Sequence, residues 1–330
     1  MKTLKVLSIL ALCLFLLSAH APKRKTTIFM IGDSTMANKD ISGDKQERGW
    51  GMMLKNFFND DIIVDNHALN GRSSKSFIDE GRWAEVLNKI TPGDYVFIQF
   101  GHNDEKKDAR RHTEPGTSFD ENLRKFVTET RERGGIPVLL NSVVRRIFSQ
   151  SATAVADDDL RTNSSKNLSE GDTLVDTHGA YLLPPRRVAK QMDVPFIDAN
   201  KITHDLEQGL GPEKSKKLHM WFRPGETKSL PEGRQDNTHY NIYGAYTVAG
   251  LLSDAIVESV PSLKKYHCRY DISVATDGSG LFSNIQDAVN AAPLHKETTI
   301  VLNGGKWSKP TVPASKEIKF ILRGGAIWDD

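Results

Sequence analysis

The chain has 330 residues and a formal net charge of +2, with 44 Lys and Arg against 42 Asp and Glu. This length suits one large domain together with a smaller one. A charge so close to balance argues against a nucleic-acid-binding protein, which usually carries a clear basic excess.

Residues 1–21 are predicted to form a secretory signal peptide. The start, Met1–Lys5, is basic, the run from Val6 to Leu17 is apolar, and the end is Ala19-His20-Ala21. An apolar core too short to span a bilayer, followed by Ala-x-Ala, is typical of such leaders. We therefore expect an exported protein, periplasmic or extracellular, without membrane insertion. Removal of the signal peptide leaves Cys268 as the single cysteine, so we expect no intramolecular disulfide.

From residue 22 to residue 260, strand-length apolar runs alternate with amphipathic stretches. The expected strands are Thr27–Ile31, Ile62–Asn66, Tyr95–Phe100, Pro137–Asn141 and Val194–Ile197. The expected helices are Trp50–Phe58, Trp83–Ile90, Phe119–Arg133, Pro185–Met192 and Ile242–Val257. Such alternation predicts an α/β domain with a parallel sheet between two layers of helices. Ligands of such sheets sit beyond the carboxyl ends of the strands.

Three later segments depart from this alternation. Arg146–Asp176 is polar and lacks a clear period, which predicts a long surface excursion. Leu218–Arg234 is interrupted by glycine and proline and is expected to be irregular. Residues 261–330 begin with a linker and continue with short strands and glycine pairs, which indicates a separate small β-rich unit.

Four polar patches lie next to the predicted strand ends or the last helix. They are Gly32-Asp33-Ser34-Thr35, Asn66–Ser73, Gly101–Asp104 and Asp236–His239. Each one alone is an ordinary turn or helix cap. Together, at what we expect to be one edge of the sheet, they indicate a catalytic site.

The residue types in these patches suit nucleophilic ester hydrolysis. Ser34 needs a base to become a nucleophile, and His239 can supply it. Asp236, three residues earlier, can hold the other ring nitrogen of His239. The amides of Ser34 and Gly71 and the side chain of Asn103 are candidate oxyanion donors. We expect a glycine at position 71 because a side chain there would hinder close backbone approach.

Other catalytic signatures are missing from the sequence. There is no Gly-x-Ser-x-Gly, no His-Glu-x-x-His and no Walker-type loop. We expect no metal and no organic cofactor. Metal-dependent deacetylation stays open as an alternative, because four histidines have no assigned role: His67, His102, His178 and His219.

The four patches resemble the conserved blocks of the SGNH, or GDSL-like, hydrolases: "GDST", "NGRS", "GHND" and "DNTH". "RGWGMML", "GDYVFIQFGHND" and "DNTHYNIYGA" narrow the resemblance to rhamnogalacturonan acetylesterases, carbohydrate esterase family 12, over residues 26–257. The resemblance implies a three-layer, flavodoxin-like sheet and hydrolysis of acetyl esters on pectic rhamnogalacturonan. It also implies Ser34 as nucleophile, His239 as base, Asp236 as its orienter, and Ser34, Gly71 and Asn103 as the oxyanion hole.

The C-terminal segment carries a second resemblance. "ISVATDGSGLFSNIQDAVNAAP" is similar to the opening of pectin methylesterases, whose domain is a right-handed β-helix. About 60 residues follow Tyr270, and the catalytic motifs of that family are missing. A β-helix buries its core by stacking several coils. We therefore expect residues 270–330 to resemble the start of a β-helix, without methylesterase activity.

The expected partner is an acetylated pectic polysaccharide. Arg72, next to the oxyanion glycine, is the preferred substrate-binding residue, since cations can pair with galacturonate carboxylates. Lys75, Arg145, Arg146 and Arg186 are further candidates. Two alternatives stay open: another ester, such as acetylxylan or a small lipid or thioester, and a non-catalytic carbohydrate-binding protein. The sequence does not set the oligomeric state.

Overall fold

The computed structural model describes residues 24–149 and 171–329, so the predicted signal peptide lies outside the described residues. The main sheet has five parallel strands in the order β3-β1-β4-β5-β8. They are β1 (Thr26–Gly32), β3 (Ile62–Asn66), β4 (Tyr95–Gln99), β5 (Ile136–Leu140) and β8 (Phe196–Ile197). In order of appearance this is 2-1-3-4-5, the flavodoxin-like order. The predicted parallel sheet is confirmed.

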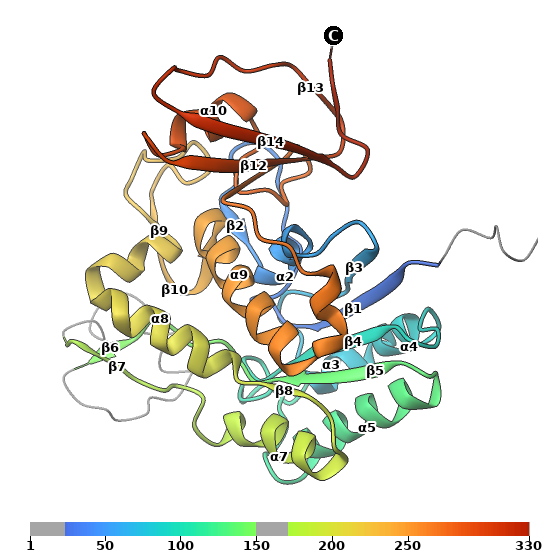
Figure 1. The fold of residues 1–330 in the computed structure, drawn as a ribbon. Helices are drawn as coiled ribbons and strands as arrows, with labels where there is room; N and C mark the ends of the chain where they lie inside the picture. The colour runs from blue at the N-terminus through green and yellow to red at the C-terminus, as the bar shows by residue number, and fades with distance from the viewer. Residues whose placement is uncertain (1–23, 150–170, 330) are drawn as a thin grey trace, which may run out of the picture.

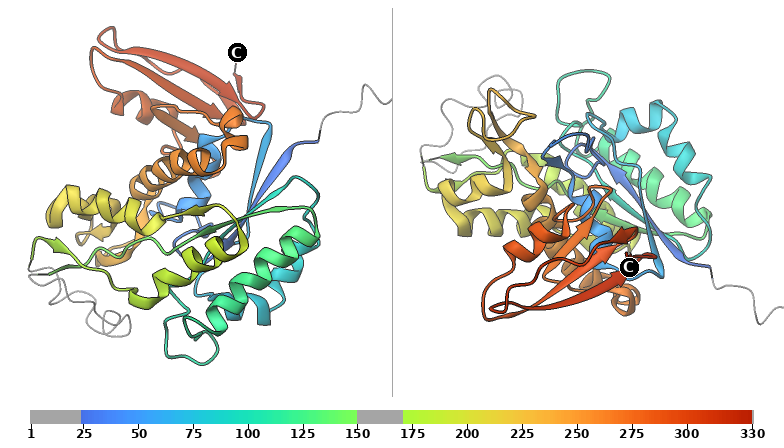
Figure 2. Two further views of the ribbon diagram at one scale, coloured as in Figure 1. Left: turned by 60° about the horizontal axis from the view of Figure 1, so that its bottom comes forward. Right: turned by 90° about the horizontal axis from the view of Figure 1, so that it is seen from above.

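Helices cover both faces of this sheet, as Figures 1 and 2 show. Alternate residues of β1 point to opposite faces: Ile28 and Met30 join one core, and Phe29 and Ile31 join the other. The first face carries α2 (Trp50–Met53), a 3₁₀ turn (Leu54–Phe57) and α9 (Ile242–Ser259). The second carries α3 (Ser74–Asp79), α4 (Arg82–Leu87), α5 (Ser118–Glu132) and α7 (Leu183–Met192). No helix among the described residues is long and apolar enough to cross a bilayer.

A second, antiparallel sheet in the order β2-β10-β9 stands beside the main one. Its strands are β2 (Glu47–Arg48), β9 (His219–Phe222) and β10 (Arg234–Asn241). The expectation of an irregular segment from Leu218 to Arg234 is therefore wrong at its start. The Asp236–His239 patch belongs to β10, not to an edge of the parallel sheet as predicted. The register of β10 with β9 shifts between Asp236 and Tyr240, which marks a bulge.

The Arg146–Asp176 segment begins and ends in a short antiparallel pair, β6 (Phe148–Ser149) with β7 (Thr173–Leu174). Its first residue is not on the surface: Arg146 is fully buried, donates to Ser215 Oγ over 2.9 Å and lies over the Trp221 ring. The predicted surface excursion is wrong for this end. Residues 150–170 lie outside the described residues.

The C-terminal segment forms a parallel sheet of its own, β11 (Ile272–Ala275), β12 (Glu297–Asn303) and β14 (Glu317–Arg323). The short strands β13 (Lys306–Trp307) and β15 (Ile327–Trp328) also pair in parallel. With α10 (Ile285–Ala291) they enclose a separate apolar core. Parallel strands stacked in this way agree with the expected β-rich unit, and the resemblance to a β-helix stays a prediction.

Polar contacts join this segment to the first domain, beyond α9 and β2 in Figure 1. Arg48 Nε donates to the carbonyl of Gly278 over 3.0 Å, and Lys55 pairs with Asp277 over 2.7 Å. The amide of Cys268 donates to the carbonyl of Phe57 over 2.9 Å. The segment is therefore anchored on β2 and on the turn that follows α2.

Candidate active site

Ser34 stands in a tight turn directly after β1. The buried Asp33 makes this turn, because its Oδ1 accepts the amide and the hydroxyl of Thr35 over 2.9 and 2.8 Å. Its own carbonyl accepts the amides of Met36 and Ala37. Burial raises the pKa of the Asp33 carboxyl. A Cβ on Gly32 would lie 2.7 Å from the carbonyl oxygen of Gln99, so glycine is required where β1 ends against β4.

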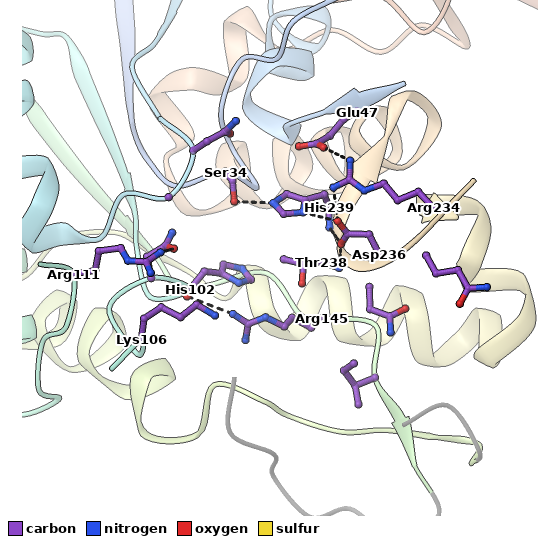
Figure 3. A pocket seen from close by; sticks show the side chains of 16 residues that line it. Ser34, Glu47, His102, Lys106, Arg111, Arg145, Arg234, Asp236, Thr238 and His239 are labelled. Atoms are coloured by element: carbon purple, nitrogen blue, oxygen red, sulfur yellow. Dashed lines mark hydrogen bonds and ion pairs between the residues drawn. The ribbon is translucent and has the colours of Figure 1, made fainter. Parts of the chain in front are cut away.

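The structure brings Ser34, His239 and Asp236 into one row (Figure 3). His239 Nε2 lies 3.0 Å from Ser34 Oγ, and His239 Nδ1 lies 2.9 Å from Asp236 Oδ2. Because a carboxylate only accepts, Nδ1 carries the proton and Nε2 is left to accept from the serine hydroxyl. Asp236 Oδ1 accepts the amides of Thr238 and His239, which folds the bulge of β10 around the carboxylate.

A row of alternating charges continues behind Asp236. Arg234 Nη2 donates to Asp236 Oδ2 over 2.6 Å, and Arg234 Nη1 donates to Glu47 Oε2 over 2.7 Å. Lys39 Nζ lies 2.8 Å from Glu47 Oε1 and donates to Asn70 Oδ1 over 2.5 Å. Burial opposes ionisation of Asp236, but the contacts with His239 and Arg234 outweigh it and hold its pKa far below the usual range.

The pKa of Glu47 is also lowered. Burial raises it, but the electrostatic effects of His239, Lys39 and Arg234 together outweigh burial. Strand β2, which carries Glu47, pairs with β10. The pairing of these two strands thus links Asp236 to Lys39 and, through Lys39, to the turn that contains Gly71.

The candidate oxyanion donors Ser34, Gly71 and Asn103 line one cavity. The amide group of Asn103 is oriented from both sides: Nδ2 donates to the carbonyl of Arg72 over 3.1 Å, and Oδ1 accepts from Arg111 over 3.2 Å. Its second N–H is therefore available to a ligand. Ser34 follows β1 and Asn103 follows β4, at the point where the strand order reverses, which is where such sheets bind ligands.

The structure gives a second reason for glycine at position 71, and the predicted close approach of a ligand to its backbone stays a prediction. A Cβ built there would meet no atom within 4 Å. Gly71 has φ +76°, so glycine is required by the left-handed backbone of the turn.

The cavity has a volume of about 490 Å³ and a basic lining. Its cations are Lys106, Arg111, Arg145 and Arg234, against Glu47 and Asp236. The sequence analysis singled out Arg145 from this group, but not Lys106, Arg111 or Arg234.

Arg72, the preferred substrate contact, does not line this cavity. Its Nε pairs with Glu80 over 3.0 Å, and its Nη1 donates to the carbonyl of Asn70. The carbonyl of Arg72, which positions Asn103, faces the site instead. Three further candidates for substrate contact do not line the cavity either. Lys75 pairs with Asp79, Arg186 pairs with Asp198, and Arg146 is buried and donates to Ser215 Oγ.

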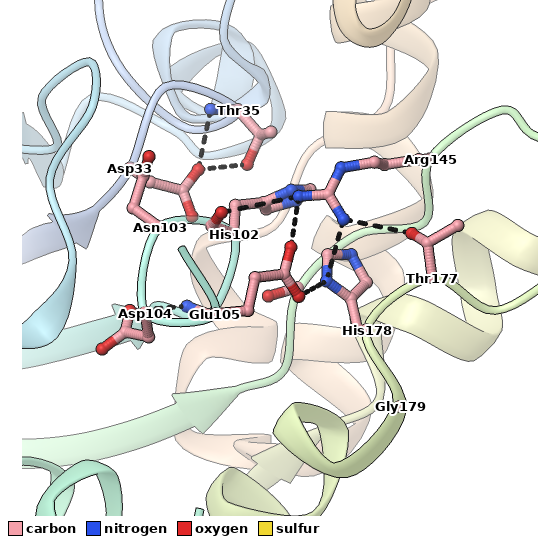
Figure 4. A network of polar contacts seen from close by, with 12 residues as sticks. Asp33, Thr35, His102, Asn103, Asp104, Glu105, Arg145, Thr177, His178 and Gly179 are labelled. Carbon is pink, nitrogen blue, oxygen red and sulfur yellow. Dashed lines mark hydrogen bonds and ion pairs between the residues drawn. The ribbon is translucent and has the colours of Figure 1, made fainter. Parts of the chain in front are cut away.

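Arg145 belongs to a buried network below the cavity (Figure 4). Glu105 accepts from Arg145 over 2.5 Å and lies 3.0 Å from His178 Nδ1. Burial raises the pKa of Glu105, but Arg145 and His178 together bring it below the usual value. The ring of His102 stands against that of His178, with 4.5 Å between centroids, and burial and then Arg145 depress its pKa. His102 is therefore neutral.

The four histidines considered for a metal do not share one site: His102 stands against His178, whereas His67 and His219 lie elsewhere. His67 contacts Asp65, His219 contacts the buried Glu207, and His178 contacts Glu105. Within residues 24–149 and 171–329, no three His, Cys, Asp or Glu side chains gather as a metal site.

Comparison with known proteins supports an esterase. Residues 30–244 match the model of the GDSL-like Lipase/Acylhydrolase family. The rhamnogalacturonan acetylesterase RhgT of Bacillus subtilis (strain 168) is 36% identical over 244 residues, which cover 74% of this chain and 95% of that one. The probable rhamnogalacturonan acetylesterase YesY of the same organism is 29% identical, over 70% of this chain and 92% of that one.

A crystal structure of the protein YxiM from Bacillus subtilis has the same fold, with a TM-score of 0.55 and 23% identity. The alignment covers 72% of this chain and 58% of that chain. The family match extends from β1 into the first turn of α9 and includes all four patches. The chain belongs to the GDSL-like lipase/acylhydrolase family and is an ester hydrolase.

Proposed function

We propose that this protein is a serine esterase that removes acetyl groups from a pectic polysaccharide, with acetylated rhamnogalacturonan as the preferred substrate. The observation that carries the proposal is the row Ser34–His239–Asp236 within a basic cavity. The names of RhgT and YesY support the same substrate. The signal-like residues 1–21 support export, which would bring the enzyme to a polymer that cells cannot take up intact.

In the first half of the proposed reaction, Ser34 Oγ attacks the acetyl carbonyl while His239 Nε2 takes the hydroxyl proton. The amides of Ser34 and Gly71 and the free N–H of Asn103 hold the tetrahedral oxyanion. The intermediate collapses by breaking the bond to the sugar oxygen, which receives the proton from His239. The products are a free sugar hydroxyl and an acetyl ester on Ser34.

In the second half, water gives a proton to His239 and attacks the acetyl ester. Collapse of the second intermediate breaks the bond to Ser34 Oγ, which takes back the proton, and acetate leaves. Asp236 stays ionised throughout and stabilises the imidazolium that forms in each half. Its pKa, held far below the usual range, suits this role.

The cavity lining favours a charged sugar chain. Lys106, Arg111 and Arg145 stand on its walls, and a basic cavity raises the local concentration of an anionic polymer. A lipid ester would need an apolar acyl pocket, but Ile147 is the one aliphatic residue among those that line the described cavity. We therefore favour a uronate-containing polymer over a neutral xylan or a lipid.

The test is acetate release from acetylated rhamnogalacturonan and from acetylxylan by the protein and its Ser34→Ala variant. We expect faster release from the pectic polymer, and loss of release from both polymers in the variant. Release from xylan alone would contradict the pectic substrate but keep the mechanism. A folded protein that releases acetate from neither polymer would favour the non-catalytic carbohydrate-binding alternative.

A further inference from the structure

A second cavity adjoins the active-site cavity. It has a volume of about 300 Å³, and the two cavities share Glu47, Asn70 and Arg234 in their linings. Glu47 and Arg234 lie beyond His239 as seen from Ser34 in Figure 3. The two cavities therefore adjoin each other at the Glu47–Arg234 ion pair.

The walls of the second cavity are held in place by the protein itself. One wall comes from residues 39–47, which lead into the start of β2, and the other from residues 220–234, which run from β9 to the start of β10. Asp44 joins them: its Oδ2 accepts the amide of Lys228 over 2.6 Å, and its carbonyl accepts from Ser229 Oγ over 3.2 Å. The cavity is preformed, so a ligand gains its contacts without ordering these loops.

The lining suits an uncharged, hydroxyl-rich ring. Each of its cations already lies in an ion pair: Lys45 with Asp40, Lys39 with Glu47, and Arg234 with Glu47 and Asp236. Two of the paired acids, Asp40 and Glu47, also line this cavity, so its charges are nearly balanced, whereas the acidic partners of Arg111 and Arg145 lie outside the lining of the active-site cavity. Gln46, Asn70 and Ser229 add amide and hydroxyl groups, and Met220 and Leu230 add apolar surface. Sugar rings present hydroxyl donors and acceptors around an apolar C–H face, which matches this mixture.

We propose that the second cavity is a sugar subsite, which binds an uncharged ring of the polysaccharide chain next to the acetylated residue. The proposal rests on the proposed function, because the chain has to present its acetyl group to Ser34. A ring bound there contacts the ion pair that holds Asp236. Binding energy gained away from the ester is thereby available to position the reacting groups.

The test measures how affinity depends on chain length. Acetylated oligosaccharides from the pectic backbone, one short and one longer by two rings, are titrated calorimetrically into the Ser34→Ala protein, which cannot consume them. We expect the longer ligand to bind about tenfold more tightly. The Leu230→Trp substitution fills the second cavity and should abolish this gain. Leu183→Trp, on the exposed surface of α7, is the matched control and should keep it.

Lys45→Ala is the second variant if Leu230→Trp does not fold. Lys45 lies on the rim of the cavity, with its side chain about half exposed, so its removal should reduce the gain without a cavity-filling ring. A full gain in folded Leu230→Trp, or in Lys45→Ala where Leu230→Trp does not fold, would overturn the subsite, as would the lack of any gain in the Ser34→Ala protein. Failure of the unsubstituted protein to release acetate from either oligosaccharide would instead overturn the proposed function.

Discussion

Arg234 and His239 share one oxygen of Asp236: the guanidinium donates to Oδ2 over 2.6 Å and the imidazole Nδ1 over 2.9 Å. The other oxygen accepts two backbone amides. Four donors thus fix the plane of the carboxylate, and Glu47 fixes the guanidinium in turn. The direction in which Asp236 presents its charge to His239 is set by residues on both β2 and β10.

Substitution of the nucleophile should separate activity from stability. Ser34 Oγ contacts His239, and removal of one hydroxyl from a half-buried turn costs little folding energy. We expect Ser34→Ala to lower kcat by at least about 10⁴-fold. The midpoint of thermal unfolding should stay within about 2 °C. Activity on acetyl esters and calorimetric unfolding check this, and a variant with substantial activity would exclude Ser34 as the nucleophile.

Loss of Arg234 should impair the catalytic step through Asp236. In Arg234→Gln the carboxylate loses one of its four donors and can rotate away from His239, so we expect kcat to fall about tenfold. Arg82→Gln is the control, since Arg82 is 35% exposed at the side chain against 33% for Arg234 and also pairs with one glutamate. The kinetics of a small neutral ester such as 4-nitrophenyl acetate measure the effect.

The same substitution allows a test of the charge row. Because Glu47 reaches Asp236 through Arg234, Glu47→Gln should add little loss in the Arg234→Gln background. If the fold-losses in kcat of the two single variants multiply in the double variant, the two residues act independently.

Arg111 should act on the oxyanion hole through Asn103. Its guanidinium holds Asn103 Oδ1, so Arg111→Met leaves the amide group free to turn. We expect kcat for 4-nitrophenyl acetate to fall about tenfold with KM little changed, because this neutral ester offers no carboxylate to bind. Arg111→Lys should restore part of the loss.

A double-mutant cycle separates this role from substrate binding. Arg111→Met should cost much less in an Asn103→Ala background than in the unsubstituted protein. An unchanged kcat in Arg111→Met, together with a raised KM for the pectic polymer, would assign Arg111 to the substrate alone.

The buried network of Glu105, Arg145 and His178 should contribute to the free energy of unfolding. Glu105→Gln removes the buried carboxylate that pairs with Arg145, and the loss of one member of a buried ion pair costs about 3–5 kcal/mol. Urea unfolding at neutral pH should show this loss. Lys125→Ala, which breaks an exposed ion pair with Glu129, is the control and should cost less than about 1 kcal/mol.

The loss of unfolding free energy in Glu105→Gln should decrease as the pH falls. The pKa of Glu105 is lower in the folded protein than its ordinary value of 4.5. Its contribution is therefore complete above that value and disappears as the pH falls through the lower, folded pKa. The difference in unfolding free energy between the two proteins should shrink at about pH 4 and below. A difference that stays constant with pH would exclude the ionised carboxylate as its source.

The parallel sheet could be predicted because its strands are continuous apolar runs. Tyr95–Gln99 is buried along its whole length, and the observed strand ends one residue before the predicted one. Helix α8 (Ala199–Lys214) was not anticipated, since Gly209, Gly211 and Pro212 weaken its helical pattern. Strand β10 was missed because the polar sequence "RQDNTHYN" lacks the period of a strand. Its place is set by pairing with β2 and β9.

The residue types of the four patches were sufficient to bring Ser34, His239 and Asp236 together as candidates. The residues that position them were not predictable. Arg234 and Arg111 lie outside the patches, and each gains its role from a contact made only in the folded chain. Arg72 shows the reverse error: proximity to Gly71 in sequence suggested a substrate contact, but its side chain turns away to Glu80.

Strand β2 consists of two residues, and their side chains contact different parts of the protein. Glu47 accepts from Arg234, which pairs with Asp236, while Arg48 donates to the carbonyl of Gly278 in the C-terminal segment. A change that loosens the C-terminal segment would therefore disturb Arg48, which is the neighbour of Glu47 in β2. We expect a protein shortened after residue 260 to lose this contact, and with it part of what holds β2 and Glu47 in place.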